Sequence, residues 1–377
     1  MKKKFFIITT VPDSFIFFKG QIQILKQNFD VQMVSSPGKN FKIFCKEEDV
    51  IGHKIGMQRG ISLIKDIKSL INMSILFYKN KPSYIHGNTP KAGLISMIAG
   101  WILRVPHRIY YIHGLRYEGE SGLKKRILLY MEKASCYFAS DIFAVSFGIK
   151  KTIVKDRITS KKINIIHYGS INGIDCKYFS PMNPNITCIK RNFDFEGNEF
   201  VFGYVGRVVA DKGINELVTS FISINKIHNN TKLVLVGPYE EFFNPLDSDK
   251  INEINHHPDI IKVDFQNDVR PFYNLFDAFI YPSFREGFGI SIIEALAMKL
   301  PVVASDISGC NEIISHNENG ILVKKKSINE LLLSMNDLIA NPIKYSKYAN
   351  SGRDSVIEKY SQDEVWKKTL KAYKKLK

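Results

Sequence analysis

Residues 281–297 of the chain read YPSFREGFGISIIEALA. An apolar run of strand length ends at Tyr281, a loop with two glycines follows, and a helical pattern begins near Gly289. The first amide groups of such a helix have no partner inside it, so they form a site for an anion such as phosphate. Gly287 and Gly289 let the backbone approach a ligand where a Cβ atom would block it. The stretch therefore predicts a strand, a glycine loop and a helix that together bind a phosphate group.

Two glutamates lie eight residues apart in this stretch. Glu294 falls about one and a half turns into the predicted helix, close enough to its start to accept hydrogen bonds from ribose hydroxyls. It parallels the acidic residue of dinucleotide-binding sites. Glu286 lies on the loop itself and would face a sugar. Because pairs of glutamates at this spacing are common by chance, the surrounding strand, loop and helix carry the prediction.

A second candidate site follows the run FGYVGR at residues 202–207. Arg207 leaves the end of a predicted strand and can bind a diphosphate with its guanidinium fork, and Lys212 adds a point charge beside it. The alternative is that both cations are merely solvated. Their position between glycines, directly after a strand, favours the binding site.

Short apolar runs alternate with longer amphipathic segments along the whole chain, which is typical of parallel sheets covered by helices. The length of 377 residues favours two domains. Residues 181–198 contain two prolines and little periodicity, so we predict a linker there. The predicted strands are residues 5–9, 30–34, 84–86, 108–112, 141–145, 162–166, 200–205, 232–236, 260–264, 278–281, 302–305 and 321–323.

The fold class is therefore α/β, with two doubly wound domains whose strands end at a ligand cleft. We predict an N-terminal domain over residues 1–185, a C-terminal domain over residues 186–360, and a final helix over residues 361–377 that crosses back to the first domain.

The chain carries a formal net charge of +16, and the excess lies in one half. Residues 1–190 contain 30 Lys and Arg and 12 Asp and Glu, whereas residues 191–377 contain 23 and 25. No zinc site or aromatic platform accompanies the basic residues, so we expect no nucleic-acid partner. An anionic membrane surface is the predicted partner, although solvated helix faces would explain the same charges. The expected contact surface comprises Lys124-Lys125-Arg126, Lys150-Lys151, Lys161-Lys162 and the apolar helix after Thr89.

Several features concern the compartment of the protein. The longest apolar stretch, residues 92–103, is shorter than the roughly 20 residues that span a bilayer. The basic start of the chain imitates a signal peptide, but polar residues and Pro12 end the following apolar run too early. The five cysteines are widely spaced and form no Cys-x-x-Cys pair, which indicates neither disulfides nor a zinc site. We therefore expect a cytoplasmic protein.

Motifs of one known family run through residues 200–323. They are Gly203-Tyr204-Val205-Gly206-Arg207 with Lys212-Gly213, Asp268-Val269 with Tyr273, Tyr281-Pro282-Ser283, Glu286-Gly287-Phe288-Gly289 through Glu294-Ala295, Pro301 through Asp306 with Gly309 and Glu312, and Asn319-Gly320. This half resembles the retaining glycosyltransferases of the GT-B fold, family four. The first half is similar to members that assemble bacterial surface polysaccharides, in residues 9–12, 86–93 and 112–116.

The resemblance implies a GT-B architecture, in which two Rossmann-like domains face a central cleft. It makes Glu286 and Glu294 the paired glutamates of the family, with Glu286 catalytic. The donor-binding residues that it implies are Arg207, Lys212, Gly206, Phe288, Gly289, Ile290 and Glu294, where residues 288–290 present backbone amides.

The resemblance also implies roles in the first half. His113 follows the predicted strand 108–112 and aligns with an active-site histidine that contacts the donor sugar, so it is a candidate catalytic residue. His86 has the same geometry on the neighbouring strand, and it and Thr10 are candidate acceptor-binding residues. A structural role is the alternative for each lone histidine. The chain departs from many relatives in lacking paired glycines over residues 10–14 and in carrying Gln266 where glycine is common.

The implied reaction is transfer of a hexose or N-acetylhexosamine, with retention, from a nucleotide sugar to a hydroxyl of a lipid-linked glycan. UDP is the nucleotide that the resemblance favours, and O-antigen or capsule synthesis is the implied process, at the inner face of the plasma membrane. No Asp-x-Asp motif flanked by a strand is present, so we expect no metal and no cofactor, with Arg207, Lys212 and helix amides neutralising the leaving diphosphate. A nucleotide-sugar epimerase of the same fold is the alternative enzyme. A basic nucleic-acid-binding protein and a catalytically silent membrane scaffold are the alternatives outside enzymes.

Overall fold

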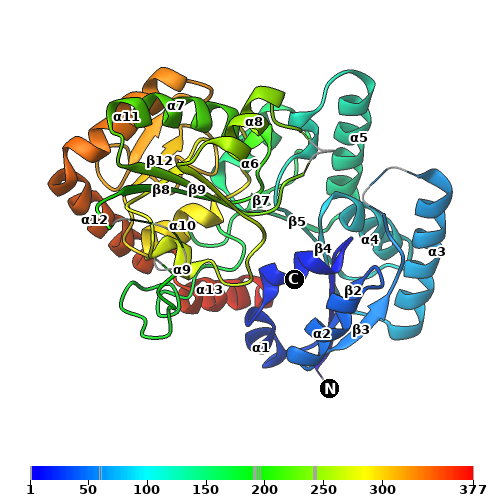
Figure 1. Ribbon diagram of the computed structural model, residues 1–377. Helices are drawn as coiled ribbons and strands as arrows, with labels where there is room; N and C mark the ends of the chain where they lie inside the picture. Colours follow the sequence, from blue (N-terminus) through cyan, green and yellow to red (C-terminus); the bar gives the residue numbers. More distant parts are fainter. Residues whose placement is uncertain are drawn as a thin grey trace. The chain divides into compact units, whose positions relative to one another are not determined.

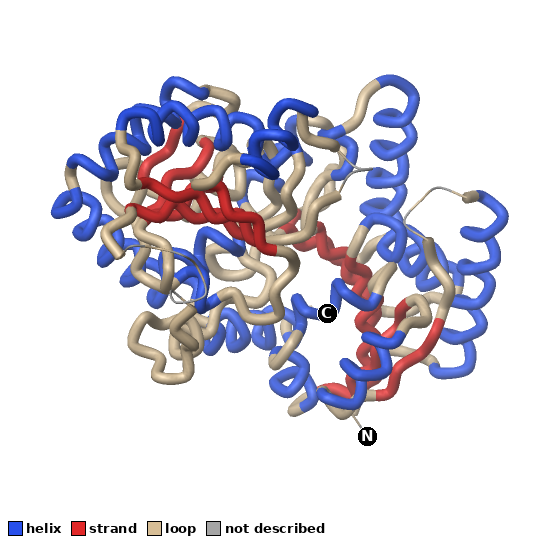
Figure 2. The backbone as a smooth tube through the Cα atoms, in the orientation of Figure 1, coloured by secondary structure: helices blue, strands red, loops and turns tan. Residues whose placement is uncertain are grey.

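The protein divides into two compact units in the computed structural model, which describes residues 2–58, 60, 62–189, 193, 195, 197–240 and 244–376 (Figure 1). The first unit comprises residues 1–173 and 362–377, and the second comprises residues 174–361. Each unit is an α/β domain built on one parallel sheet, shown red in Figure 2, which agrees with the predicted fold class.

The first unit contains a seven-stranded sheet in the order β3-β2-β1-β4-β5-β6-β7. Its strands are β1 (Lys3–Ile8), β2 (Phe29–Ser35), β3 (Ile51–Lys54), β4 (Tyr84–Asn88), β5 (His107–Ile112), β6 (Asp141–Ala144) and β7 (Ile163–Asn164). All neighbouring strands pair in parallel. The direction of strand addition reverses between β1 and β4, and ligands of such sheets bind at the carboxyl ends of the strands beside the reversal.

The unit also contains helices. They are η1 (Pro12–Phe18), α1 (Gln21–Lys26), α2 (Lys39–Glu47), α3 (Leu63–Asn80), α4 (Pro90–Ile102), η2 (Arg116–Gly119), α5 (Gly122–Phe138), α6 (Phe147–Lys155) and α13 (Gln362–Lys374). All of these except the C-terminal α13 lie between the strands of the unit along the chain. Helix α4 packs between α3 and α5 and against β4 and β5 (Figure 1).

Helix α4 is apolar because it belongs to the core. Ala92, Met97 and Ala99 are fully buried, and only Trp101 and Ile102 near its end are about half exposed. The prediction that the apolar helix after Thr89 contacts a membrane is therefore wrong for most of its length.

The second unit contains a six-stranded parallel sheet in the order β10-β9-β8-β11-β12-β13. Its strands are β8 (Phe200–Val205), β9 (Thr231–Val236), β10 (Ile260–Val263), β11 (Ala278–Tyr281), β12 (Val302–Ser305) and β13 (Ile321–Val323). Its helices are η4 (Ala210–Lys212), α7 (Ile214–Ile227), α8 (Ser248–His256), α9 (Arg270–Tyr273), α10 (Ile290–Ala297), α11 (Ile328–Ala340) and α12 (Pro342–Tyr360). Here the strand order reverses between β8 and β11, so the loops after these strands are the expected ligand site.

The division between the units falls earlier than the predicted boundary after residue 185. Residues 174–183 join the second unit because they bond to its helices. Ile174 donates its amide hydrogen to the Tyr360 carbonyl at 2.8 Å, and the Arg353 guanidinium donates to the carbonyls of Cys176 and Phe179. Residues 190–192, 194 and 196 of the predicted linker lie outside the described residues.

The final helix α13 is grouped with the first unit. The indole of Trp366 donates to the Asn172 side chain at 2.7 Å, and the Tyr373 hydroxyl lies 2.7 Å from His86 Nε2. Within the described residues, no helix combines the length and the apolar character needed to cross a membrane.

Candidate functional site

The loops after β8 and β11 meet through an ion pair in the second unit. Lys212 Nζ contacts Glu286 Oε1, and the two side chains are only 12% and 11% exposed. The hydroxyl of Tyr281, the last residue of β11, donates to the same carboxylate oxygen at 2.7 Å. Glu286 Oε2 takes no hydrogen bond from the part of the chain that the structure describes, so one carboxylate oxygen stays available to a ligand hydroxyl.

A glycine makes this contact between loops possible. Gly213 directly follows η4 with φ of +72°, and a Cβ atom there would lie 2.1 Å from the Pro282 carbonyl oxygen. The Phe284 amide also donates to the Asp211 carbonyl at 2.9 Å, and Arg285 pairs with the Asp211 carboxylate at 3.4 Å. The loop that carries Glu286 is thus held at several points.

The start of α10 presents fewer free amides than the sequence predicts. The Gly289 amide donates to the Gly309 carbonyl at 3.0 Å, and the Ile290 amide donates to the Phe288 carbonyl at 3.0 Å. The expectation that all three amides of residues 288–290 are unpaired is therefore wrong for Gly289 and Ile290. Among the described residues, the amides of Phe288 and Ser291 have no backbone partner and can still face an anion.

Glu294 lies on α10 and is bound by a tyrosine. Tyr273 Oη donates to Glu294 Oε2 at 2.8 Å. Burial raises the pKa of Glu294 to about 7, while the hydrogen bond from Tyr273 acts in the opposite direction. The side chain therefore titrates close to neutral pH.

Arg207 follows β8 and is paired with an acidic side chain. Its guanidinium donates to Glu240 Oε2 at 2.9 Å, and the Arg207 side chain is 43% exposed. Gly206 allows the chain to turn here, because a Cβ atom at this position would lie 2.6 Å from the Tyr204 hydroxyl. The predicted diphosphate ligand would compete with Glu240 for Arg207.

In the first unit, His113 lies at the carboxyl end of β5, close to the reversal between β1 and β4. Its Nε2 lies 2.8 Å from Asn88 Oδ1, and its ring stacks on Phe17 with 5.8 Å between centroids. Burial lowers the pKa of His113 to about 3, so the imidazole is neutral at physiological pH. Its buried Nδ1 atom has no hydrogen-bond partner among the residues that the structure describes.

The structure contradicts the acceptor-binding prediction for His86. This residue is 1% exposed, and both ring nitrogens have partners within the unit, Tyr373 and Asn88. Thr10 is buried too, and its hydroxyl accepts from the Ala92 amide and pairs with the Thr89 hydroxyl. Both residues therefore support the local structure, and neither offers a free group to an acceptor.

Family models match both halves of the chain. The model described as Glycosyl transferases group 1 covers residues 185–355, and the model described as Glycosyltransferase Family 4 covers residues 24–177. The chain is 36% identical to the capsular polysaccharide biosynthesis glycosyltransferase CapM of Staphylococcus aureus, over 98% of this chain and 97% of CapM. The chain belongs to the family 4 glycosyltransferases of surface-polysaccharide synthesis.

Other comparisons agree with this family. This glycosyltransferase is 27% identical to the UDP-Gal:alpha-D-GlcNAc-diphosphoundecaprenol alpha-1,3-galactosyltransferase of Escherichia coli, over 73% of its own chain and 70% of the relative. HepE of Anabaena, crystallised with UDP and glucose, superposes with a TM-score of 0.82 at 18% identity, covering 99% of this chain and all of HepE. The likeness to HepE shows that the glycosyltransferase has the GT-B fold.

The predicted membrane contact residues differ in their surroundings. Lys161 Nζ donates to the carbonyls of Cys136, Tyr137 and Ala139 at the end of α5, so its charge stabilises a helix terminus. Lys124 pairs with Glu120 at 2.7 Å. The Lys161 ammonium is therefore bound at the end of α5, while the residue itself is exposed.

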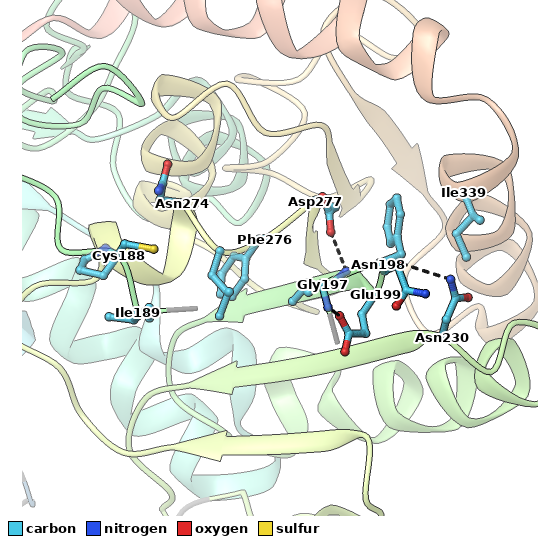
Figure 3. A pocket seen from close by; sticks show the side chains of 14 residues that line it. Cys188, Ile189, Gly197, Asn198, Glu199, Asn230, Asn274, Phe276, Asp277 and Ile339 are labelled. Carbon is cyan, nitrogen blue, oxygen red and sulfur yellow. Dashed lines mark hydrogen bonds between the residues drawn. The ribbon is translucent and has the colours of Figure 1, made fainter. Parts of the chain in front are cut away.

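A cavity of about 560 Å³ lies in the second unit (Figure 3). Its lining includes Phe200 at the start of β8 and Asp277 just before β11, at the opposite sheet edge from Gly206 and Glu286. The Asp277 carboxylate is engaged by the Val201 amide at 2.8 Å. We therefore assign the glycosyltransferase site by its charged loops and not by this cavity.

Sequence reasoning missed several residues that support the site. Tyr281 and Glu240 bind predicted site residues. Asn88 connects the two histidines, and Tyr373 binds His86. Tyr281 could have been found as the last residue of a strand whose loop carries Glu286. No sequence signal links Tyr373 to His86, because 287 residues separate them. Among the described residues, no group of three or more His, Cys, Asp or Glu gathers as a set of metal ligands.

Proposed function

We propose that this glycosyltransferase transfers a hexose or N-acetylhexosamine from a UDP-sugar to a hydroxyl of a lipid-linked glycan, with retention at the anomeric carbon. The observation that carries the proposal is the Lys212–Glu286–Tyr281 cluster between the loops after β8 and β11. A cation, a carboxylate with one unpaired oxygen and nearby helix amides can bind a diphosphate and a sugar side by side.

The donor roles follow from chemistry. Arg207, once released from Glu240, and Lys212 would bind the diphosphate and stabilise the negative charge that develops on the leaving group. Glu294, on α10, would accept hydrogen bonds from ribose. Glu286 would bind sugar hydroxyls through Oε2. Gly206 and the amides near the start of α10 would let the donor approach the backbone.

Retention at the anomeric carbon has to be explained here without a covalent bond between the sugar and the protein. Retaining glycosidases hold two carboxylates about 5 Å apart across the sugar. Here Glu294 is assigned to ribose and Glu286 is paired with Lys212, so neither is a free nucleophile. We therefore propose attack on the face from which the nucleotide leaves. The bond from the anomeric carbon to the phosphate oxygen breaks, the bond to the acceptor oxygen forms, and the acceptor proton passes to the leaving phosphate.

The donor and acceptor classes rest on relatives. The Escherichia coli relative is named for UDP-galactose and for an acceptor linked to undecaprenol through a diphosphate. HepE was crystallised with UDP-glucose. Capsule or O-antigen synthesis is the process that we propose for this chain.

A lipid-linked acceptor calls for a membrane-facing surface, which we assign to α3 and α5. Helix α3 buries Met73 and Phe77 on one side, yet its opposite side carries six large apolar residues that are 47% to 84% exposed. They are Leu63, Ile64, Ile67, Ile71, Ile75 and Tyr78. Spacings of three and four residues place most of them on one helix face. Helix α5 adds exposed residues at similar spacing, Leu123, Ile127, Tyr130 and Tyr137.

Cations accompany both apolar faces. Lys65, Lys68 and Lys79 lie exposed on α3, and Lys125 and Arg126 lie exposed on α5. A helix with apolar residues and flanking lysines suits the interface of an anionic bilayer. We propose that the protein is cytoplasmic and binds the inner face of the plasma membrane through α3 and α5.

Transfer can be tested with a panel of UDP-sugars and an undecaprenyl-diphosphate-linked acceptor. We expect a product whose new bond has the donor's anomeric configuration by NMR, and at least about a hundredfold slower product formation with Glu286→Gln. An inverted product would refute retention. A new nucleotide sugar formed from donor alone would indicate an epimerase instead.

Membrane binding can be tested by flotation with vesicles that contain phosphatidylglycerol. The double variant Ile64→Gln/Ile71→Gln should lose flotation at low salt while it keeps the wild-type melting temperature. The matched control Leu333→Gln/Ile343→Gln alters side chains of the second unit that are 60% and 77% exposed, and it should float like the wild type. Equal flotation of both variants would exclude α3 as the contact.

A further inference from the structure

Four side chains form a continuous hydrogen-bonded chain in the first unit. His113 Nε2 lies 2.8 Å from Asn88 Oδ1, Asn88 Nδ2 lies 2.8 Å from His86 Nδ1, and His86 Nε2 lies 2.7 Å from the Tyr373 hydroxyl. His113 comes from the end of β5, Asn88 and His86 come from β4, and Tyr373 comes from α13. This hydrogen-bonded series of side chains therefore joins His113, a candidate active-site residue, to the last helix, α13.

The surroundings of Asn88 fix which way its amide points. Asn88 Nδ2 donates to the His86 carbonyl at 3.0 Å, besides His86 Nδ1, and the Ile8 carbonyl lies 3.4 Å away. A reversed amide would place Oδ1 against these carbonyl oxygens, which cannot donate. Nδ2 is therefore the atom that faces β1 and His86, and Oδ1 is the atom that faces His113.

The direction of Asn88 then fixes both imidazoles. Because Nδ2 donates, His86 Nδ1 is an acceptor, and the His86 proton lies on Nε2 and is donated to Tyr373. Because Oδ1 can only accept, His113 must donate from Nε2. A neutral imidazole carries one proton, so His113 Nδ1 is an acceptor. Every member donates to the next, from His113 to Asn88, His86 and Tyr373, and hydrogen bonds in one direction polarise and strengthen one another.

We propose that Asn88, with His86 and Tyr373 behind it, is a positioning residue that holds His113 as the neutral Nε2–H tautomer, so that His113 Nδ1 accepts a hydrogen bond from a substrate hydroxyl. The proposal rests on the proposed function for the identity of that substrate as a sugar. A ligand hydroxyl that donates to His113 Nδ1 adds one more hydrogen bond at the start of the hydrogen-bonded series. The site therefore selects a hydroxyl and disfavours a group that can only accept.

The state of Nδ1 supports this role. The atom is buried and has no hydrogen-bond partner in the described part of the chain, and leaving a buried acceptor unpaired is unfavourable. A substrate hydroxyl would remove that cost. Phe17 stacks on the ring from η1, so the hydroxyl must enter beside this side chain.

The two imidazoles are also kept uncharged. Burial lowers the pKa of both to about 3, and for His86 the neighbouring His113 lowers it further. The titratable side chains packed against them are Tyr111 of β5 and Tyr373 of α13. His113 is therefore an acceptor at neutral pH and cannot serve as an acid.

The tautomers can be read directly by NMR of the intact protein labelled with ¹⁵N-histidine. We expect His113 and His86 to carry their protons on Nε2 from pH 5 to 8, with Nδ1 unprotonated. His113 found with its proton on Nδ1, or as an imidazolium at pH 7, would overturn the proposal. This readout needs no substrate, so it can fail while transfer activity stands.

A variant tests the link to catalysis. In Asn88→Asp the carboxylate can only accept, so His86 Nδ1 loses its donor and the negative charge favours protonated histidine. We expect an imidazolium signal from His113, about tenfold lower kcat/KM, the effect of one lost hydrogen bond, and a new loss of activity on the acid side of the pH profile. The control Asn164→Asp makes the same change in β7, where Asn164 donates to the Ile142 carbonyl, and should leave both readouts unchanged.

The outcomes separate the two proposals. An Asn88→Asp protein with unchanged tautomers and an unchanged pH profile would refute the positioning role. If His113→Ala keeps full transfer activity while the wild-type tautomers are as expected, the hydrogen-bonded chain stands and the assignment of His113 to the substrate fails. If Asn88→Asp does not fold, the wild-type NMR spectrum alone still decides the tautomer.

Discussion

The ammonium group of Lys212 and the carboxylate of Glu286 form a largely buried ion pair, although 74 residues separate them in the sequence. Tyr281 donates to the same carboxylate oxygen. The pair joins the loops after β8 and β11, where the strand order of the second sheet reverses. A residue predicted to bind the diphosphate thus lies against one predicted to face the sugar.

This geometry gives the first prediction. Glu286→Gln keeps the size of the side chain but removes the charge that binds Lys212. The residue that faces the sugar is then no longer held by an ion pair against the residue that binds the diphosphate. We expect kcat to fall at least about a hundredfold, the scale of a misplaced reacting group. Steady-state rates with a saturating UDP-sugar would measure it, and circular dichroism would verify folding. The same substitution at Glu253, in a surface ion pair of α8, should leave the rate unchanged; a Glu286→Gln enzyme of wild-type rate would disprove the assignment.

Arg207 and Glu240 give the second prediction. Because Glu240 occupies the guanidinium, a diphosphate must displace it. Glu240→Gln should therefore bind UDP more tightly, by roughly threefold, since an exposed ion pair contributes about 1 kcal/mol at most. Arg207→Ala should bind UDP at least about tenfold more weakly, as expected for a lost charge-assisted hydrogen bond. Calorimetry would measure the UDP affinity of the wild type and of both variants. Equal affinities in all three proteins would show that Arg207 does not bind the diphosphate.

Glu294 gives a prediction about pH. Its pKa is raised to about 7, so the carboxylate gains a proton as the pH falls below 7. A protonated carboxyl group accepts fewer hydrogen bonds from ribose hydroxyls. UDP affinity should therefore fall by about tenfold from pH 8 to pH 6, the effect of losing a hydrogen bond to a charged group. Glu294→Gln cannot titrate, and its UDP affinity should vary less over this range. A parallel pH dependence in wild type and variant would contradict the ribose assignment.

Chelation provides a further test. If Arg207 and Lys212 supply the positive charge at the leaving diphosphate, activity should persist at the same rate in EDTA. The measurement is the initial rate with and without the chelator, followed by addition of Mg²⁺ or Mn²⁺. Loss of activity in EDTA that either ion restores would show that the protein cations are insufficient.

Much of the fold could be predicted because buried strands of a parallel sheet are apolar runs. The twelve predicted strands all correspond to observed ones. The missed strand, β3, reads Ile-Gly-His-Lys, lies at the edge of the first sheet and is mostly exposed. An edge strand is buried on fewer sides, so it needs no apolar run. The boundary near residue 174 was missed for another reason, because the bonds of Arg353 that hold residues 176 and 179 come from a helix far along the chain.

The site could be predicted in part. The positions of Glu286 and Lys212 follow from strand ends, since parallel strands bring their carboxyl ends to one edge. The hydrogen bonding of the amides at the start of α10 cannot be predicted from the strand ends, because the Gly289 amide binds the Gly309 carbonyl of a separate loop. The burial of His86 likewise depends on Tyr373 of the last helix. Local sequence predicts which secondary-structure element or loop carries a side chain, whereas the hydrogen-bond partners of that side chain depend on tertiary packing.

Glu132 gives a prediction about stability. It lies in α5, is 3% exposed and accepts a hydrogen bond from Tyr110 Oη at 2.8 Å. Burial raises its pKa to about 7, while the Tyr110 hydrogen bond acts against the shift. Because the folded pKa is above the unfolded value, the folded unit binds more protons between the two values, and stability is lost as the pH rises through 7.

Glu132→Gln removes this titration and keeps an acceptor for Tyr110. The variant should melt close to the wild type at pH 5 and clearly higher at pH 8, where the shift corresponds to up to about 3 kcal/mol. Scanning calorimetry at both pH values would measure the difference in melting temperature between the two proteins. Both proteins contain the same neutral histidines, so the contribution of these residues is the same in both. Glu358→Gln changes an exposed side chain of α12 and should show the same difference from wild type at both pH values. A Glu132→Gln protein whose advantage does not grow with pH would show that this carboxylate is not a buried charge at pH 8.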